Sequence, residues 1–553
     1  MITDHLVELV AEALRSAASD GLVSSGELPE ISFERPRRRE HGDWATNVAL
    51  SAARGHGNPR TVAEAIVERL PDSDLVERVE VAGPGFLNFH LSHGWLADVV
   101  RRAADPGSRF GRLPAERKEK VNVEYVSANP TGPVNVVSGR HAAVGDAVSN
   151  LLEAVGREVT REYLINDAGR QINLFAASVI ARYLNEFGID AQVPEDGYHG
   201  EYLVDVAKQI AAEHGDAFVS MSEPGRTDKV RDIALALMIE EIRSSLERFG
   251  TRFDVWFSEQ DRVHSSGAVT KVLDQLRDRN AIEERAGALW FLSTRHGDDK
   301  DRVIVRSDGD STYLAADAAY VSDKFARGFD RLIYLWGADH HGTVTRVLGV
   351  AEALGFDRSA VEIRLIQIVT LKRGEEAVKS SKRAGNLVPL DELVDEVGAD
   401  AARYTFLTRS IDAPLEFDID LAKEQAPENP VYYVQYAHAR ISSILRNADD
   451  QRVSTDARSA PLERLTHMSE TELMRKLAAY EEVLPEAAVL RAPQRVARYV
   501  EELASLFSAF YRDCRVIGDD AELTSARLAL CIAAKVVIAD ALALLGVSAP
   551  ERM

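Results

Sequence analysis

The chain has 553 residues, with 66 Lys and Arg against 88 Asp and Glu, which gives a formal net charge of −22. This balance excludes a protein that coats DNA through a uniformly basic surface, so any nucleic-acid contact must be a local patch. Hydrophobic residues at 45% and charged residues at 28% are ordinary for a globular protein, and the length indicates about three domains.

The first unit, predicted over residues 1–110, begins with a helix and continues with short alternating segments. Its start, MITDHLVELVAEALRS, mixes acidic and apolar residues at helical spacing and lacks the basic start and apolar run of a signal peptide. Val79–Val81 and Phe86–Phe89 flank a Gly-Pro-Gly turn and are predicted as strands. The pattern predicts an α+β unit, which ends in a connector rich in Gly, Pro and Arg over residues 105–120.

The second unit, predicted over residues 119–420, alternates strands with helices. The predicted strands are 121–126, 159–164, 331–336 and 364–369, and the predicted helices are 142–155, 166–187 and 343–354. This alternation is typical of a parallel sheet wound with helices, so we expect an α/β fold of Rossmann type. Residues 190–300 are charged, with long helical periodicity, and are predicted to form a helical insertion that carries little chemistry.

The third unit, predicted over residues 421–553, has only helical periodicity. Six residues recur at steps of four and three and share one helix face, namely Val496, Val500, Leu503, Phe507, Phe510 and Cys514. Cys514 and Cys531 lack CxxC spacing, and no apolar run reaches about 18 residues. We therefore expect an all-α bundle and a cytoplasmic protein with reduced cysteines and no membrane partner.

The segment Asn129–Pro133 follows a predicted strand and precedes a helix that carries Gly145-Asp146. A strand, a Gly/Pro turn and a helix N-terminus form a site where backbone N–H groups can face an anion. Many α/β turns are built in this way, so the segment by itself indicates only a tight turn.

A second segment, Tyr334–Gly342, runs from a buried strand into Gly-Ala-Asp-His-His-Gly. Ligands of open α/β sheets lie beyond the carboxyl ends of the strands, where these polar groups are expected. The adjacent histidines lack the HExxH spacing of zinc enzymes, and we expect no metal site.

Two further segments carry charge suited to a ligand. Lys379–Asn386 is a small-residue loop with three cations, which could follow the charge of a pyrophosphate leaving group or could simply be solvated. Tyr313 and Asp317 lie four residues apart in a predicted helix and share a face. A phenol beside a carboxylate suits a guanidinium, although a buried aromatic beside a helix cap explains the spacing equally well.

In this order the segments resemble the arginyl-tRNA synthetases, class I aminoacyl-tRNA synthetases of the bacterial type, and the likeness runs nearly end to end. Residues 40–47 (EHGDWATN) and 83–88 (GPGFLN) are similar to the family's N-terminal domain, which contacts the tRNA elbow. Residues 163–171 (YLINDAGRQ), 315–320 (AADAAY), 337–342 (GADHHG) and 381–386 (SKRAGN) are similar to its catalytic domain. Residues 429–440 (NPVYYVQYAHAR) and 545–553 (LGVSAPERM) are similar to its anticodon-binding domain.

The resemblance implies roles for particular residues. It places the substrate arginine at Glu124, Ser127, Asn129, Tyr313 and Asp317. It places ATP at Val137, Gly337, Asp339, His340 and Ser381, and catalysis at Lys379, Lys382, Asn135 and Ser138. It places tRNA at Arg38, Asn47, Tyr432, Tyr436 and Arg495. The implied partners are L-arginine, an arginine-specific tRNA, and ATP with Mg²⁺, for a monomer that binds no DNA.

Local basic and aromatic side chains make tRNA binding compatible with the net negative charge of the chain. The candidate cations are Arg35, Arg37, Arg38 and Arg39 near the N-terminus, and Arg491, Arg495, Arg498, Arg512 and Arg515 in the bundle. Tyr432, Tyr433 and Tyr436 could stack on unpaired anticodon bases, and we expect at least one of them to be helix core instead.

The sequence departs from the family pattern where ATP is expected. The family reads His-Ile-Gly-His after the NPTGP segment, whereas this chain has Asn135-Val136-Val137-Ser138. Val137 adds two methyl groups where adenine would stack, and losing one transition-state donor costs about 10²- to 10³-fold in rate. His141 lies one turn further along the helix, and nothing in the sequence indicates that it substitutes. Ser380 replaces the methionine of the lysine loop, a milder change.

Three hypotheses follow. The chain is an arginine–tRNA ligase, with or without impairment at the ATP site. Alternatively, it is a paralogue that transfers arginine to a non-tRNA acceptor in specialised metabolism, or a non-catalytic regulator that binds arginine or tRNA. ATP–pyrophosphate exchange, with and without tRNA, separates the first hypothesis from the other two.

Overall fold

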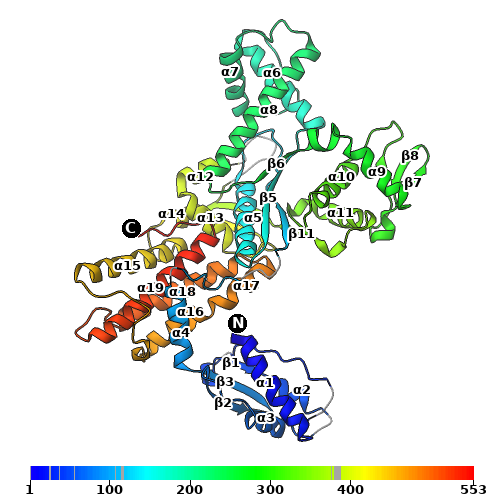
Figure 1. The fold of residues 1–553 in the computed structure, drawn as a ribbon. Helices are drawn as coiled ribbons and strands as arrows, with labels where there is room; N and C mark the ends of the chain where they lie inside the picture. Colours follow the sequence, from blue (N-terminus) through cyan, green and yellow to red (C-terminus); the bar gives the residue numbers. More distant parts are fainter. Residues whose placement is uncertain are drawn as a thin grey trace.

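A computed structural model describes residues 2–23, 27–36, 38–54, 57–105, 107–113, 118–374, 376–378 and 388–553. Figure 1 shows an N-terminal unit at the bottom, a sheet-containing body at the centre and a bundle of helices at the left. A helical knob projects from the top of the body, and a smaller lobe extends to the right. The fold class expected from the sequence is confirmed.

The N-terminal unit packs three helices on a small antiparallel sheet. The helices are α1 (Ile2–Ser19), α2 (Val48–Ala52) and α3 (Pro59–Val67). The strands β1 (Trp44–Thr46), β2 (Val76–Ala82) and β3 (Phe86–Leu91) pair in the order β1-β3-β2. Gly85 closes the turn between β2 and β3 at φ 143°, and a Cβ there would lie 2.9 Å from the Pro59 carbonyl oxygen. Helix α4 (His93–Ala104) then leads out of the unit and packs on the bundle.

The body holds a five-stranded parallel sheet in the order β11-β10-β4-β5-β6. Its strands are β4 (Lys120–Glu124), β5 (Glu158–Ile165), β6 (Val255–Ser258), β10 (Arg331–Gly337) and β11 (Val361–Ile366). The chain runs from β4 to β5 and β6 on one side and later places β10 on the other side of β4. The strand order therefore reverses between β4 and β10, and such a reversal opens a crevice at the carboxyl ends of the strands.

Some helices of the body begin at other residues than the sequence predicts. Helix α5 (Val136–Ala154) starts six residues before the predicted start at 142, because Asn135 caps it by accepting a hydrogen bond from the Ser138 amide. Helix α6 (Arg170–Glu186) starts after a loop that the sequence pattern assigns to the helix. Helices α10 (Tyr313–Ala326) and α11 (His341–Ala353) follow the prediction closely.

The strand predicted over residues 364–369 is wrong as a single element. Its first part belongs to β11, and the chain then leaves the large sheet for β12 (Val369–Arg373). Strand β12 pairs with β13 (Glu376–Ala377) and β14 (Leu415–Asp418) in a separate sheet. The buried guanidinium of Arg140 occupies the junction, where it donates hydrogen bonds to the carbonyl oxygens of Gln367 (2.8 Å) and Ser410 (3.0 Å).

The helical insertion predicted over residues 190–300 is correct only for its first half. Helices α6, α7 (Tyr202–His214) and α8 (Glu223–Arg248) form the knob at the top of Figure 1, with a core of their own. The chain then returns to the large sheet as β6, a strand of only four residues. Helix α9 (Ala268–Asp278) and a sheet of β7 (Ile282–Arg285), β8 (Ala288–Phe291) and β9 (Arg302–Val305) follow in the right-hand lobe.

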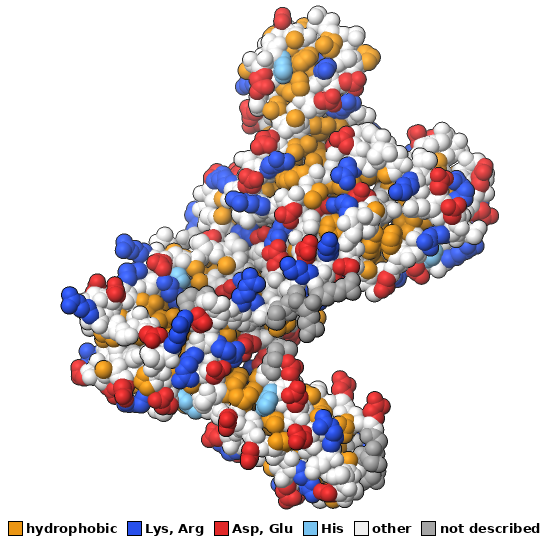
Figure 2. Space-filling model, in the orientation of Figure 1, with side chains coloured by type: hydrophobic (Ala, Val, Ile, Leu, Met, Phe, Trp, Pro, Cys, Tyr) orange, Lys and Arg blue, Asp and Glu red, His pale blue; other side chains and the backbone are white. Residues whose placement is uncertain are grey.

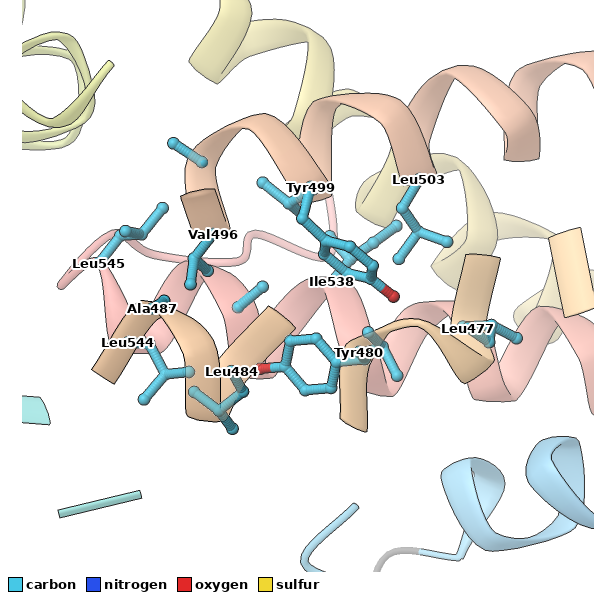
Figure 3. Packing of buried hydrophobic residues seen from close by; sticks show 14 of the residues in the cluster. Leu477, Tyr480, Leu484, Ala487, Val496, Tyr499, Leu503, Ile538, Leu544 and Leu545 are labelled. Carbon is cyan, nitrogen blue, oxygen red and sulfur yellow. The ribbon is translucent and has the colours of Figure 1, made fainter. Parts of the chain in front are cut away.

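Helices α12 (Leu390–Val397), α13 (Ala399–Leu407) and α14 (Ile419–Lys423) lead from the body into the C-terminal part, with β14 between α13 and α14. The C-terminal part is helical, as expected, and consists of α15 (Pro430–Asp450), α16 (Met468–Ala478), α17 (Tyr480–Leu490), α18 (Gln494–Asp513) and α19 (Ala521–Leu544). Figure 3 shows the interior, where Tyr480, Tyr499 and Ile538 lie among leucines from neighbouring helices. The six residues predicted to share one face of α18 are all buried.

One buried arginine ties the bundle to the sheet domain. Arg403 of α13 forms an ion pair with Asp146 of α5 and donates hydrogen bonds to the Phe249 carbonyl (3.2 Å) and the Thr251 hydroxyl (3.0 Å). The Gly546 backbone packs so closely on Arg403 that a Cβ at this position would overlap the guanidinium. The end of the chain is thereby fixed against the helix that follows β4.

No helix among the described residues is long and apolar enough to span a membrane. Figure 2 shows Lys and Arg side chains interspersed with Asp and Glu over the visible face of all the lobes. Basic side chains therefore do not gather into one uniform surface on this face.

Candidate active site

Acidic side chains meet at the carboxyl edge of the large sheet. Glu124 ends β4, while Asp167 and Glu259 follow closely on β5 and β6, and these three strands are neighbours. The Asp167 carboxylate accepts hydrogen bonds from the Ser258 hydroxyl (2.6 Å) and the Gln260 amide (2.8 Å), which joins the ends of β5 and β6. Sequence reasoning misses Glu259, because it falls in the region predicted to carry little chemistry.

Asp317 of α10 lies close enough to these acidic side chains for their charges to change its pKa. Its burial, together with the charges of Glu259 and Glu124, raises the pKa of its carboxyl to about 7, and Arg346 only partly opposes the rise. Such an environment favours a cation that can share the carboxylates. Tyr313, one helical turn earlier at the start of α10, is 75% exposed and reachable by a ligand. The predicted pair of Tyr313 and Asp317 therefore lies on one helix, with an acidic environment suited to a guanidinium.

Glu124 already has a cationic partner within the chain. The ammonium group of Lys324, itself fully buried, lies 2.6 Å from one carboxylate oxygen of Glu124. The same ammonium lies 4.2 Å and 4.0 Å from the ring centroids of Tyr320 and Tyr334, and 3.7 Å from Glu162. Glu124 thus belongs to a buried charge network, in which its carboxylate already has a fixed cationic partner. This pairing spans 200 residues and is not apparent from the sequence.

The chain turns sharply after β4. Val126 and Ser127 have φ values of 66° and 41°, a left-handed conformation that is strained for a β-branched residue such as Val126. The Ser127 hydroxyl donates to Glu124 (3.3 Å) and accepts from the Leu164 amide (3.1 Å). Asn129 donates through its side-chain amide to Gln171 of α6 (2.5 Å). The turn therefore holds Ser127 and Asn129 at the ends of β4 and β5. Gln171, to which the resemblance assigns no role, is bonded to Asn129 there.

The N-terminus of α5 holds the altered signature positions. The Asn135 side-chain oxygen is occupied by the Ser138 amide (3.0 Å), the Gly139 amide donates to the Asn135 carbonyl (2.9 Å), and the Val136 amide donates to Val388 (3.1 Å). Three of the first four amides thus have partners within the chain. An anion at this helix end would find fewer backbone donors than the strand–turn–helix pattern indicates. Val137 remains 37% exposed beside them.

The segment after the lysine loop lies directly on this helix end. The Leu390 amide donates to the Val134 carbonyl (2.8 Å), and Pro389 forms a backbone bridge with Asn135. A cavity of about 80 Å³ is lined by Asn135, Val136, Val137, Val369, Thr370, Leu371, Val378 and Val388. The residues on either side of the loop, 378 and 388, therefore share a cavity with the altered signature. Lys379, Ser381 and Lys382 themselves lie outside the described residues.

The turn after β10 is open to solvent. The side chains of Asp339 and His340 are 76% and 58% exposed, at the carboxyl end of the strand. A Cβ on Gly337 would come within 2.5 Å of the Asp339 carboxylate, so a larger residue here would displace that side chain. In the described part of the chain, no three His, Cys, Asp or Glu side chains are grouped to hold a metal ion.

The predicted tRNA contacts differ in exposure. Arg38 and Asn47 are exposed on the N-terminal unit, where Arg38 pairs with Glu40 (3.3 Å). In the bundle, Arg495 pairs with Glu486 (3.0 Å) and remains half-exposed. Arg491 is different, since its side chain is only 11% exposed and pairs with Glu362, so its predicted place on a basic surface is wrong.

The tyrosines of α15 differ in their surroundings. Tyr432 and Tyr436 stack with ring centroids 6.0 Å apart and planes 9° apart, and Tyr436 is 40% exposed. The Arg440 guanidinium lies 4.6 Å above the Tyr436 ring. Tyr433 is partly buried, and its hydroxyl lies 3.3 Å from the Ser508 hydroxyl. Tyr436 and Arg440 thus form a flat, cationic surface of the kind on which an unpaired base stacks.

Comparison with known proteins gives consistent results along the chain. The family model for the arginyl-tRNA synthetase N-terminal domain matches residues 4–91. The model for the class I (R) tRNA synthetase catalytic domain matches residues 107–409, and the DALR anticodon-binding model matches residues 434–553. Two of the three matched parts are therefore similar to synthetase domains for arginine, and the third is similar to an anticodon-binding domain.

Individual relatives agree. The chain is 47% identical over 560 residues to an arginine–tRNA ligase of Geobacillus kaustophilus, covering 100% of both chains. It is 47% identical over 552 residues to an arginine–tRNA ligase of Moorella thermoacetica, covering 99% of this chain and 98% of that one. Its fold is similar to that of the arginyl-tRNA synthetase structure of Thermus thermophilus, with a TM-score of 0.77, 22% identity and full coverage of both chains.

Proposed function

The chain belongs to the arginyl-tRNA synthetase family, and from this premise we propose that it works as an arginine–tRNA ligase. A carboxylate oxygen of arginine attacks the α-phosphorus of ATP, which forms arginyl-adenylate and releases pyrophosphate. A hydroxyl of the 3′-terminal adenosine of tRNA then attacks the activated carbonyl carbon and releases AMP. ATP, with its Mg²⁺, is a substrate in this scheme.

The observation that carries the proposal is the acidic environment of Asp317. A carboxyl with a pKa near 7, beside Glu259 and Glu124, is a site at which a guanidinium relieves repulsion between buried charges. Tyr313 supplies an exposed phenol on the same helix. Ser127 and Asn129, held at the ends of β4 and β5, are suited to the α-amino and α-carboxylate groups. Because Glu124 is paired with Lys324, we assign it to shaping this pocket electrostatically.

The nucleotide belongs in the crevice between β4 and β10. Gly337, Asp339 and His340 are proposed to line one side of it, and the α5 N-terminus with Asn135, Val137 and Ser138 is proposed to line the other. Lys379 and Lys382 are proposed to neutralise the departing pyrophosphate, with Ser381 beside them. Because the side-chain oxygen of Asn135 caps α5, only its side-chain NH₂ group remains to donate a hydrogen bond to ATP. We therefore propose that this chain binds ATP more weakly than a synthetase with two histidines at the start of this helix.

The tRNA is proposed to bind over both ends of the molecule. The helical unit, residues 421–553, is proposed to read the anticodon and contains Tyr432, Tyr436 and Arg495. The N-terminal unit, residues 1–110, is proposed to contact the tRNA elbow and contains Arg38 and Asn47. The catalytic unit, residues 119–420, lies between them in the sequence. We propose that the chain acts on tRNA as a monomer and has no role with DNA.

The comparisons give no support to the two alternative hypotheses. The chain matches ligases over its whole length, including the units expected to bind tRNA, and neither a non-tRNA acceptor nor a regulator without catalysis is indicated. Incubation with labelled arginine, ATP, Mg²⁺ and total tRNA tests the proposal. We expect acid-precipitable arginyl-tRNA, and label that stays soluble at every tRNA concentration would contradict it.

A further inference from the structure

A histidine lies at the reversal of strand order, on the helix whose start is altered. His141 of α5 is 8% exposed, and its ring Cε1 lies 3.9 Å from the point that a Cβ on Gly337 would occupy. Gly337 ends β10, and α5 is the first helix after β4. The ring of this α5 residue therefore lies beside the end of β10, at the strand-order reversal where a nucleotide is expected to bind.

His141 lies on the same helix as Val137 and Ser138, two of the residues that depart from the family signature. It follows Val137 by four positions and Ser138 by three, so all three side chains lie on one face of the helix. Four residues correspond to a rise of about 6 Å, which places the ring one turn deeper than the helix end. His141 is thus a buried polar side chain one helical turn beyond the exposed Val137 on the same face of α5.

The imidazole has a hydrogen-bonding atom without a partner. The Nε2 atom is buried and makes no hydrogen bond within the described part of the chain. Buried polar atoms of native proteins are nearly always satisfied by protein, water or a ligand, because an unsatisfied group is costly. Burial, followed by the nearby Arg140, lowers the pKa of His141 to about 4, while Asp339 opposes this shift. The ring is therefore neutral at pH 7.

A neutral imidazole suits the uncharged part of a nucleotide. It offers one donor and one acceptor, which match a ribose hydroxyl or an edge of adenine, whereas phosphates are better matched by cations. Val378 and Val388, the described residues on either side of the lysine loop, line a cavity with the start of α5, and His141 lies a turn away from that start. We propose that His141 is a nucleotide-binding residue, whose imidazole hydrogen-bonds the adenosine part of ATP and compensates for the two histidines that the start of α5 does not have. This inference rests on the proposed function, in which ATP is the substrate of this crevice.

Binding requires a small local change. Because Nε2 is enclosed in the ligand-free chain, either the ring rotates or the exposed turn at Gly337–His340 moves aside. The side chains of Asp339 and His340 are free to move aside, since they are mostly in solvent. The rest of α5 stays fixed through Arg140 and Asp146, which are buried and bonded to other elements.

The test measures binding of AMP-PNP, an ATP analogue that is not turned over, and of L-arginine by calorimetry. His141→Leu removes both ring nitrogens, His141→Gln places an amide nitrogen near the Nε2 position, and His141→Asn places one near Nδ1. We expect His141→Leu to weaken AMP-PNP binding about tenfold with arginine binding unchanged. His141→Gln should restore most of the affinity, and His141→Asn should not.

A spectroscopic measurement on the unaltered protein covers the case in which His141→Leu folds poorly. Protein labelled with ¹⁵N-histidine gives ring signals from 14 histidines. The His141 signal is the one that is lost in His141→Gln, the mildest of the three variants. Its Nε2 shift should change when AMP-PNP is added and should not change with arginine alone. An unchanged signal, equal AMP-PNP affinity in His141→Leu, or a parallel loss of both affinities would overturn the inference.

These outcomes separate the inference from the proposed function. Absence of arginyl-tRNA formation, together with AMP-PNP binding that depends on His141, would reject the function and keep the nucleotide contact. Normal arginyl-tRNA formation, together with AMP-PNP binding that does not depend on His141, would reject the contact and keep the function.

Discussion

Replacing Asp317 by Asn should weaken arginine binding and stabilise the ligand-free fold at the same time. The pKa of this carboxyl is about 7 in the folded chain, against an ordinary value of 3.8. At pH 8 its ionisation therefore costs the ligand-free fold up to about 4 kcal/mol, less what solvent screens. The uncharged amide of the Asp317→Asn variant removes that cost, and the melting temperature should rise. Arginine loses its charged partner, which is worth about 3–5 kcal/mol, so its affinity should fall by more than about 100-fold.

The stabilisation depends on pH in a defined direction. Because the folded pKa lies above the unfolded one, the penalty is absent below pH 4, grows as the pH rises, and is complete above pH 7. Melting curves by scanning fluorimetry at pH 4 and pH 8 should therefore show a gap between Asp317→Asn and the unaltered protein only at the higher pH. Calorimetric titration with L-arginine at pH 8 measures the change in affinity.

Asp323→Asn is the matched control on the same helix. Asp323 forms an ion pair with Arg327 (2.8 Å) and lies six residues further along α10. This substitution should leave arginine affinity unchanged and should not raise the melting temperature. If Asp317→Asn bound arginine normally, or if it lowered the melting temperature at pH 8, the carboxylate would be a structural group and the reasoning would be refuted.

Three further predictions concern the pocket, the nucleotide and the tRNA. The KM for arginine should rise about tenfold between pH 8 and pH 6, because the guanidinium binds the ionised form of Asp317, and Glu259→Gln should move this rise to lower pH by removing a neighbouring negative charge. Restoring His, Gly and His at positions 135, 137 and 138 should raise pyrophosphate exchange at least about tenfold at low ATP, with arginine affinity unchanged, and an unchanged rate would contradict the proposed weakness. Tyr436→Ala should weaken tRNA binding about tenfold in a filter assay without altering arginine affinity, and normal tRNA binding would remove Tyr436 from the interface.

The parts of the site that the sequence could predict are those fixed by local rules. The spacing of Tyr313 and Asp317 defines a helix face whatever surrounds it, and the structure places both on α10. The polar turn after β10 could be placed because parallel strands present their carboxyl ends at one edge. Helical periodicity alone predicts five core residues of α18 and the buried Cys514 directly after it, since a 3.6-residue repeat determines which side is buried.

The parts that could not be predicted depend on residues far apart in the chain. Lys324 pairs with Glu124 from 200 positions away, and no local pattern shows that pairing. Strand β6 has four residues within a charged region, too few for a periodicity to stand out, and Glu259 directly after it is missed for the same reason. The unpartnered Nε2 of His141 is visible only once β10 lies beside α5.

Helix ends are the least predictable local feature. The resemblance suggests Asn135 as a replacement for a catalytic histidine, yet its side-chain oxygen caps α5 and moves the helix start to Val136. Capping competes with ligand binding for the same polar atoms, and the sequence does not show which use prevails. The break between β11 and β12 has a similar origin, since Arg140 binds carbonyl groups that would otherwise continue a strand.

The rate of ATP–pyrophosphate exchange by the unaltered chain, measured with saturating arginine and ATP in the presence and absence of tRNA, tests the account most directly. Activation of arginine in the crevice beside Asp317 predicts label moving from pyrophosphate into ATP when arginine and tRNA are present, and none when lysine replaces arginine. No exchange under any of these conditions, from protein shown to bind arginine, would contradict it.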